Sequence, residues 1–225
     1  MQSFLSIREM AAERHGGDGI AFPDGAGPLG ADQLAAIADH RFLSMATRCI
    51  FQSGFNWKVV DAKWPQFEAA FEGFELPRWV MADDDVSRLL SDPRVIRNGR
   101  KLSTVPVNAR LFARKSTEHG SVGRWIGNWP LDDQVGLMAI LEAEGSFLGG
   151  VTGQYFLRFM GKDCFILSRD VTAALVRAGV IDGPAKSTRA MVAVQVAFDR
   201  WREESGLSLT TISRTLARSI DAATA

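Results

Sequence analysis

The stretch GSFLGGVTGQYFLRFMGKDCFILSRD, residues 145–170, decides the fold of this chain. It follows a segment of helical length and contains three closely spaced glycines, Gly149, Gly150 and Gly153. Glycine lets the backbone adopt positive φ and approach another chain closely. Backbone N–H groups at such a turn, beside the start of a helix, form a site for an anion. The stretch therefore predicts two helices joined by a glycine hairpin, a helix-hairpin-helix that can grip a phosphate, with a plain loop as the alternative.

The segments on both sides of this hairpin have a helical pattern of apolar residues. Residues 131–144 lead into it and residues 152–160 follow it. Further helices are expected at residues 2–15, 31–42, 64–71 with Pro65 in the first turn, 83–91, 171–178, 188–204 and 209–223. Alternation of period two is not sustained anywhere, so we predict an all-α fold. We expect residues 1–30 to form an N-terminal helix and a glycine-rich loop, and residues 31–225 a helical domain of two packed lobes.

The aromatic residues and the loops of this pattern carry two further expectations. Trp64, Phe67 and Phe71 recur at the spacing of one helix face, which is typical of core packing. Residues 120–130, with Trp125 and Trp129, are expected to form a loop. These aromatics are therefore not counted as part of a binding site.

The charge of the chain is balanced, with 26 basic and 26 acidic residues among 225. A neutral total does not favour nucleic acid as a partner, so any DNA-binding face requires local clustering. One such cluster lies between residues 94 and 115, where there are seven basic residues and no acidic ones. Its members are Arg94, Arg97, Arg100, Lys101, Arg110, Arg114 and Lys115. The alternative is a solvated basic helix face.

Metal sites and membrane segments are not indicated. Cys49 and Cys164 are far apart and do not form a zinc motif, and the three histidines lack ligand spacing. The acidic run at residues 83–85 suits the first turn of a helix better than a metal site. No apolar run approaches the ~18 residues of a membrane span, and no signal peptide is evident. We expect a cytoplasmic monomer without a cofactor.

Two ordered motifs resemble a known family. VIRNGRKLSTVPVNAR, residues 95–110, is similar to the IIRHRGKIxAIIxNAR pattern of bacterial 3-methyladenine DNA glycosylase I. QSGFNW, residues 52–57, resembles the Q-x-G-L-S-W segment of that family at nearly the same separation. The likeness runs from about Arg48 to Val171. It implies a two-lobed enzyme of the helix-hairpin-helix superfamily, which flips a damaged nucleotide out of double-stranded DNA and cuts its N-glycosidic bond.

The resemblance also assigns roles to residues. Trp57 matches the stacking tryptophan of the family, although a core position is the alternative, and Phe55, Gln52, Tyr155 and Cys49 are expected to line the same pocket. An aromatic face suits a flipped base and attracts a cationic alkylated purine. The implied DNA contacts come from the hairpin amides and the basic run, namely Gly150, Val151, Thr152, Gly153, Arg97, Arg100 and Lys101.

The chain departs from the family pattern in three places. Cys49 stands where that family has a base-contacting glutamate. Cysteine and histidine residues equivalent to its zinc ligands are not found, so no metal is expected. The region of residues 1–41 is unrelated to the aromatic N-terminal stretch of the family. An inactive lesion-binding relative is therefore one alternative function, and an unrelated helical domain with a small-molecule ligand is another.

Asp170 is the expected catalytic residue. It follows a short apolar run after the hairpin, where the superfamily has a catalytic aspartate. A carboxylate there can stabilise an oxocarbenium-like sugar or orient water. The alternative is an N-cap for residues 171–178. Bifunctional relatives carry a lysine just after the hairpin, and this chain has Gln154, so hydrolysis without strand nicking is expected.

Overall fold

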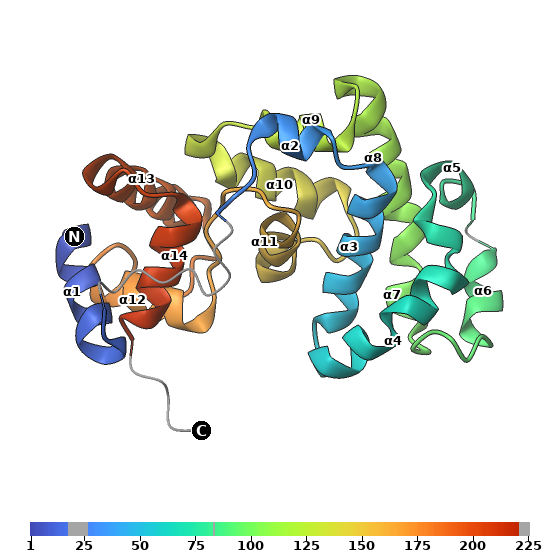
Figure 1. The fold of residues 1–225 in the computed structure, drawn as a ribbon, viewed down its shortest axis with the longest axis horizontal. Helices are drawn as coiled ribbons and strands as arrows, with labels where there is room; N and C mark the ends of the chain where they lie inside the picture. Colours follow the sequence, from blue (N-terminus) through green and yellow to red (C-terminus); the bar gives the residue numbers. More distant parts are fainter. Residues whose placement is uncertain (18–26, 83, 221–225) are drawn as a thin grey trace. The chain divides into compact units, whose positions relative to one another are not determined.

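A computed structural model describes residues 1–17, 27–82 and 84–220 (Figure 1). Every regular element within these ranges is helical, and they contain no strand, which confirms the all-α prediction. The glycine-rich loop expected up to residue 30 lies mostly outside the described residues. The chain divides into two compact units. Unit 1 contains residues 1–29, 130–136 and 163–225, and unit 2 contains residues 30–129 and 137–162.

Unit 1 is built from the two ends of the chain. Its elements are α1 (Phe4–His15), η2 (Leu131–Asp133), α12 (Arg169–Arg177), α13 (Thr188–Ser205) and α14 (Leu209–Arg218). Phe165 and Phe198 stack in its core with ring centroids 4.4 Å apart. Asp163 accepts hydrogen bonds from the backbone N–H groups of Leu209 and Thr210, which fixes the start of α14. The apolar segment after the hairpin is therefore tied to the C-terminal helix.

Unit 2 contains the sequence motifs. Its elements are α2 (Ala31–Ala35), α3 (Asp39–Gln52), α4 (Trp57–Ala70), η1 (Glu72–Phe74), α5 (Leu76–Trp79), α6 (Asp85–Leu90), α7 (Gly99–Leu102), α8 (Thr104–His119), α9 (Val122–Gly127), α10 (Gln134–Glu144) and α11 (Gly150–Phe159). The first residues of α10 are grouped with unit 1. Helices α3 and α8 lie side by side (Figure 1). Helix α3, whose last residue Gln52 begins QSGFNW, therefore lies beside the helix that carries the N-A-R motif.

An aromatic stack forms part of the core of unit 2. The ring of Trp64 stacks on those of Phe67 and Phe74 at 5.1 and 5.8 Å, and Phe71 stacks on Phe74 at 4.7 Å. All four side chains are buried, so the expected core stripe is correct. The expected start of this helix is wrong, because α4 begins at Trp57 and Pro65 lies in its interior. The packing of the stack outweighs the helical hydrogen bond that proline cannot make.

The loop expected at residues 120–130 is instead interrupted by α9. Trp125 is buried on this helix. A Cβ atom on Gly123 would lie 2.0 Å from the carbonyl oxygen of Leu34, so only glycine permits the close contact between α9 and α2. Glycine lowers helix propensity, and the tertiary contact overrides that preference here.

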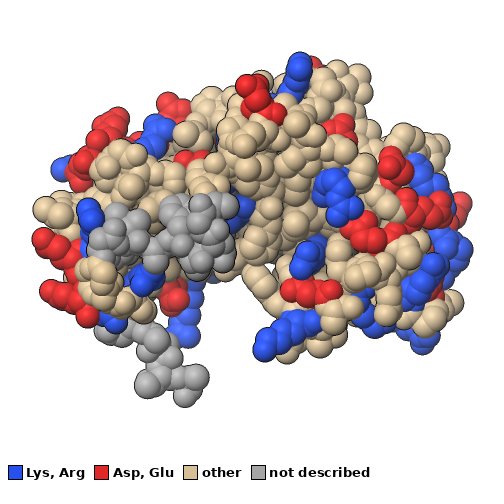
Figure 2. Space-filling view, in the orientation of Figure 1, with Lys and Arg blue, Asp and Glu red and all other residues tan. Residues whose placement is uncertain are grey.

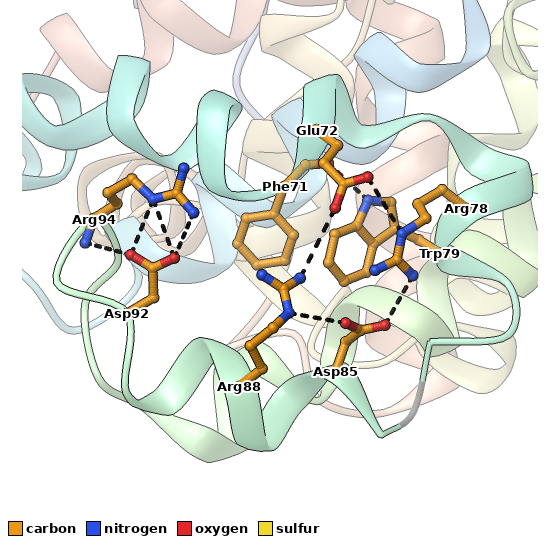
Figure 3. Close-up of polar contacts among 8 residues, drawn as sticks. All are labelled: Phe71, Glu72, Arg78, Trp79, Asp85, Arg88, Asp92 and Arg94. Atoms are coloured by element: carbon orange, nitrogen blue, oxygen red, sulfur yellow. Dashed lines mark hydrogen bonds and ion pairs between the residues drawn. The ribbon is translucent and has the colours of Figure 1, made fainter.

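A network of ion pairs connects η1, α5 and α6 (Figure 3). Asp85 accepts hydrogen bonds from Arg78 Nη1 at 2.8 Å and from Arg88 Nε at 3.0 Å. Glu72 pairs with the same two arginines, at 3.4 and 3.9 Å. Asp83 of the expected acidic turn lies outside the described residues. Asp85 therefore bridges two arginines at the start of α6.

This network predicts that acid lowers the free energy of unfolding by a small amount. The hydrogen bond from Arg78 lowers the pKa of Asp85 from 3.8 to about 2. Because this pKa is depressed in the folded state, the stabilisation is present above about pH 4 and is lost as pH falls toward 2. Asp85→Asn should reduce that acid-dependent loss by no more than about 1 kcal/mol, since the pair is partly solvated. Urea unfolding between pH 5 and 2 measures it.

Asp84→Asn is the matched control, because Asp84 makes no side-chain capping hydrogen bond at the start of α6. Its acid dependence should equal that of the parent protein. Equal acid dependence of Asp85→Asn and the parent protein would contradict the prediction.

Candidate active site

A cavity of about 220 Å³ opens in unit 2 where α3, the loop before α4 and the start of α11 meet. Its lining residues are Cys49, Gln52, Ser53, Gly54, Trp57, Val151, Thr152 and Tyr155. The structure thus brings together most of the expected pocket residues and part of the hairpin. The expected set omitted Ser53 and Gly54, although both lie inside the QSGFNW motif. The cavity thus places residues of QSGFNW and of the hairpin where they can contact one ligand.

Local turns place Trp57 at the cavity. Helix α3 ends at Gln52, and Gly54 turns the chain with φ of 85°. The side chain of Asn56 then accepts a hydrogen bond from the N–H of Lys58 at 2.9 Å and caps α4. Trp57 is the first residue of α4 and is 41% exposed, so the alternative of a core position is wrong.

The aromatic cluster around Trp57 extends beyond the lining of the cavity to one further residue, Phe159. The ring of Trp57 meets those of Tyr155 and Phe159 edge-on, with centroids 5.3 and 5.9 Å away. Phe159 was missed by the sequence analysis, although its position four residues after Tyr155 places it on the same helix face. Phe55 does not line the cavity. It is half-buried, and its ring stacks on Phe51 at 6.5 Å.

Lys101 is in the interior of unit 2 and not on a DNA-facing surface. It is 8% exposed, and its Nζ donates hydrogen bonds to the carbonyl oxygens of Ile50 at 2.7 Å, Phe51 at 3.3 Å and Ser53. These carbonyls belong to the end of α3, which carries the negative end of the helix dipole. Burial lowers the pKa of Lys101. The expected phosphate contact is therefore replaced by a capping role.

Five of the seven side chains in the basic cluster already bind acidic side chains or backbone carbonyl groups in the structure. Arg94 pairs with Asp92, Arg114 and Lys115 pair with Glu144, and Arg110 donates to the carbonyl of Val80. Figure 2 shows basic and acidic side chains interspersed over the region of α5 and α6. Arg97 and Arg100 are exposed and make no ion pair within the described part of the chain. These two arginines are what remains of the cluster for an anion.

The turn between α10 and α11 packs closely against the first residues of α11. Helix α11 begins at Gly150, which has φ of 55°, and no described side chain caps its first turn. Gly153 is needed for a different reason, because a Cβ atom there would lie 2.1 Å from the carbonyl oxygen of Leu148. Asn108 fixes the turn by two hydrogen bonds with the backbone of Ser146, at 2.8 and 3.1 Å. The free amides at the start of α11 are thus held at the edge of the cavity.

The polar groups of the cavity include no ionised side chain. Cys49 stands where a glutamate was expected, and burial raises the pKa of its thiol to about 12, so it is neutral. Gln52 donates from Nε2 to Asp61 Oδ1 at 2.7 Å. The same oxygen accepts from Arg48 Nε at 3.0 Å and from Arg48 Nη2 at 2.9 Å. The carboxylate of Asp61, which does not line the cavity, is therefore already paired with Arg48.

Asp170 lies in unit 1, exposed in the first turn of α12. The N-cap of this helix is Ser168, whose side chain accepts from the N–H of Val171 at 3.3 Å. The alternative that Asp170 is the N-cap is therefore wrong. Its catalytic role remains a prediction.

The described residues contain no group of three His, Cys, Asp or Glu side chains that could hold a metal ion. Cys49 and Cys164 are buried separately, one in each unit. No described helix is long and apolar enough to cross a membrane.

Comparisons with known proteins agree with these motifs. Residues 36–136 match the methyladenine glycosylase family. A structure of 3-methyladenine DNA glycosylase I from Staphylococcus aureus, concerned with 3-methyladenine recognition, has 20% identity and a TM-score of 0.50, over 68% of this chain and 90% of that one. A glutamine mutant of the Staphylococcus aureus enzyme has 21% identity and a TM-score of 0.49, over 55% and 77%. The chain thus resembles 3-methyladenine DNA glycosylase I, at low sequence identity.

Proposed function

We propose that this protein is a monofunctional DNA glycosylase that excises alkylated bases such as 3-methyladenine in base-excision repair. The observation that carries the proposal is the aromatic cavity between QSGFNW and the hairpin. A base flipped out of a duplex exchanges its stacking for contacts with aromatic faces. Trp57 and Tyr155 supply such faces in the cavity, and Trp57 is exposed enough to receive a ring.

The remaining roles follow from chemistry. The amides at the start of α11 and the side chains of Arg97 and Arg100 would bind phosphates, which positions the duplex without reading its sequence. An alkylated purine nucleotide carries positive charge, so Trp57 also attracts it by a cation–π interaction. Asp170 would stabilise the oxocarbenium-like sugar or orient the attacking water. Hydrolysis without a Schiff base leaves the DNA strand intact.

The direct test is base release from methylated DNA. The protein is incubated with a duplex treated with dimethyl sulfate, and free bases are separated by chromatography. We expect release of 3-methyladenine, and a loss of most of it in Trp57→Ala. Val59→Ala is the matched control, because Val59 is an exposed α4 residue that does not line the cavity. Absence of both 3-methyladenine and 7-methylguanine at high protein concentration would contradict the proposal.

A second function is favoured by Cys49. A neutral thiol replaces the carboxylate expected to contact the base, which suits a protein that binds lesions without cutting them. Such a protein would bind methylated or abasic duplexes tightly, with an affinity that falls as salt rises, and would release no base. Measuring binding and release on the same duplex separates the two functions.

A further inference from the structure

Phe147 is an exposed aromatic residue in the turn between α10 and α11. Its side chain is 52% exposed, and its φ is 60°, a conformation that residues with a Cβ atom rarely adopt. Its ring forms no aromatic pair within the described part of the chain. The turn therefore holds a strained residue whose ring is only partly covered, so packing does not account for the strain.

Two other non-glycine residues of the described chain have positive φ, and the fold gives a reason for both. Phe74 is fully buried in the aromatic stack of unit 2. Glu72 pairs with two arginines of the ion-pair network. Strained residues persist where the surrounding structure fixes them, and they cluster at functional sites. Phe147 is the one of the three described residues for which only a functional reason is left.

The neighbours of Phe147 fix its position on both sides. The backbone N–H and carbonyl of Ser146 are both hydrogen-bonded to the side chain of Asn108, which is fully buried. Leu148 is 1% exposed, and its carbonyl oxygen lies against Gly153 of α11. The ring of Phe147 is therefore presented to solvent from a turn that is anchored before and after it.

The turn lies close to the cavity along the chain. Val151 lines the cavity and is four residues after Phe147. Four residues span at most about 14 Å, and a DNA strand advances about 3.4 Å per nucleotide. Phe147 therefore lies within about four nucleotides of any base that occupies the cavity.

A nucleobase is a partner that suits this ring. Aromatic side chains stack on bases whatever the sequence, because every base has a π face. In a continuous duplex each base is covered by its neighbours, and separating them costs free energy. A ring on an anchored turn therefore stacks most readily where the duplex is already interrupted.

We propose that Phe147 is a DNA-contacting residue outside the cavity, and that its ring stacks on a base face exposed by an interruption of the duplex. This inference rests on the DNA-binding part of the proposed function. The ligand class is a nucleobase at a strand interruption such as a single-nucleotide gap, recognised without an alkyl group.

The test uses undamaged DNA, so that alkylated bases do not contribute. Fluorescence anisotropy compares a labelled continuous duplex with one that has a single-nucleotide gap, at one salt concentration. We expect the parent protein to bind the gapped duplex about 10-fold more tightly, the effect of stacking one base on an aromatic ring. Equal affinities, or binding of neither duplex at low salt, would overturn the inference.

Substitutions assign this preference to the ring. In Phe147→Ala the preference should fall to within about 2-fold, and in Phe147→Trp, which keeps an aromatic face, it should persist. Met81→Ala is the matched control, because Met81 is another exposed apolar residue of unit 2 that does not line the cavity. A preference that survives in Phe147→Ala, or that is also lost in Met81→Ala, would overturn the inference.

Phe147→Gly separates DNA binding from folding. Glycine adopts positive φ without strain, so this variant should unfold at a urea concentration at least as high as that of Phe147→Ala and should also lack the preference for the gap. Loss of the folded state in both variants would show that the ring is required for packing, and it would overturn the inference.

The outcome is distinguishable from failure of the proposed function. Release of base from methylated DNA without a preference for the gapped duplex would leave the glycosylase intact and remove the role of Phe147. A preference for the gapped duplex without base release would support the role of Phe147 in a DNA-binding protein that does not cut.

Discussion

Asp170→Asn is expected to lower the rate of base release from methylated DNA about 100-fold or more, with little change in DNA affinity. Removal of a positioned carboxylate that assists water or stabilises a developing cation has effects of about 10²–10⁴-fold. The folded state should tolerate the change, because Asp170 is exposed and the cap of α12 is Ser168. Single-turnover release assays and salt titrations of DNA binding measure the two quantities separately.

Asp182→Asn is a matched control for this experiment. Asp182 is also an exposed aspartate of unit 1, and it lies outside the hairpin and its following helix. Its base release should equal that of the parent protein. A parent-like rate in Asp170→Asn, or a loss of equal size in both variants, would contradict a catalytic role for Asp170.

Lys101→Met is expected to lower the free energy of unfolding by about 3 kcal/mol or more. The methionine keeps the length of the side chain but leaves the carbonyl oxygens of Ile50, Phe51 and Ser53 without their donor. Each buried polar group left unpaired costs about 1–3 kcal/mol. Urea unfolding followed by circular dichroism measures the change.

Arg100→Met is the matched control, because Arg100 is the neighbouring residue in α7 and is exposed. Its free energy of unfolding should stay within about 0.5 kcal/mol of the parent value. Its DNA affinity should fall, since the side chain that we propose as a phosphate ligand is removed. Equal stability of the two variants would show that the interior ammonium of Lys101 is not required.

The sequence predicted the helices of this fold better than their boundaries. Periodicity places Trp64, Phe67 and Phe71 on one buried face, and it requires no knowledge of the neighbouring chain. The start of α4 and the existence of α9 depend on tertiary contacts, because Pro65 and the glycines of α9 disfavour helix locally. Packing that decides such cases is not visible in a single sequence.

In the candidate site, too, some features were predictable from the sequence and others depend on tertiary contacts. The resemblance of QSGFNW to the family motif predicted most of the side chains that line the cavity, although it wrongly included Phe55. The role of Lys101 was not predictable, since a lysine in a basic run has the same pattern whether it meets a phosphate or the carbonyls of a distant helix end. Three residues of the basic cluster, Arg94, Arg114 and Lys115, likewise pair with acidic residues outside the window, such as Glu144.

The clamp, meaning the two hydrogen bonds between Asn108 and the backbone of Ser146, affects both the rate of anion binding and its entropy cost. A loop that two hydrogen bonds already immobilise loses little conformational freedom when an anion arrives. The hairpin would then engage a phosphate as a rigid body, without a folding step that slows encounter. Loosening this clamp by Asn108→Ala should weaken binding through the ordering penalty, even though Asn108 is buried and does not line the cavity.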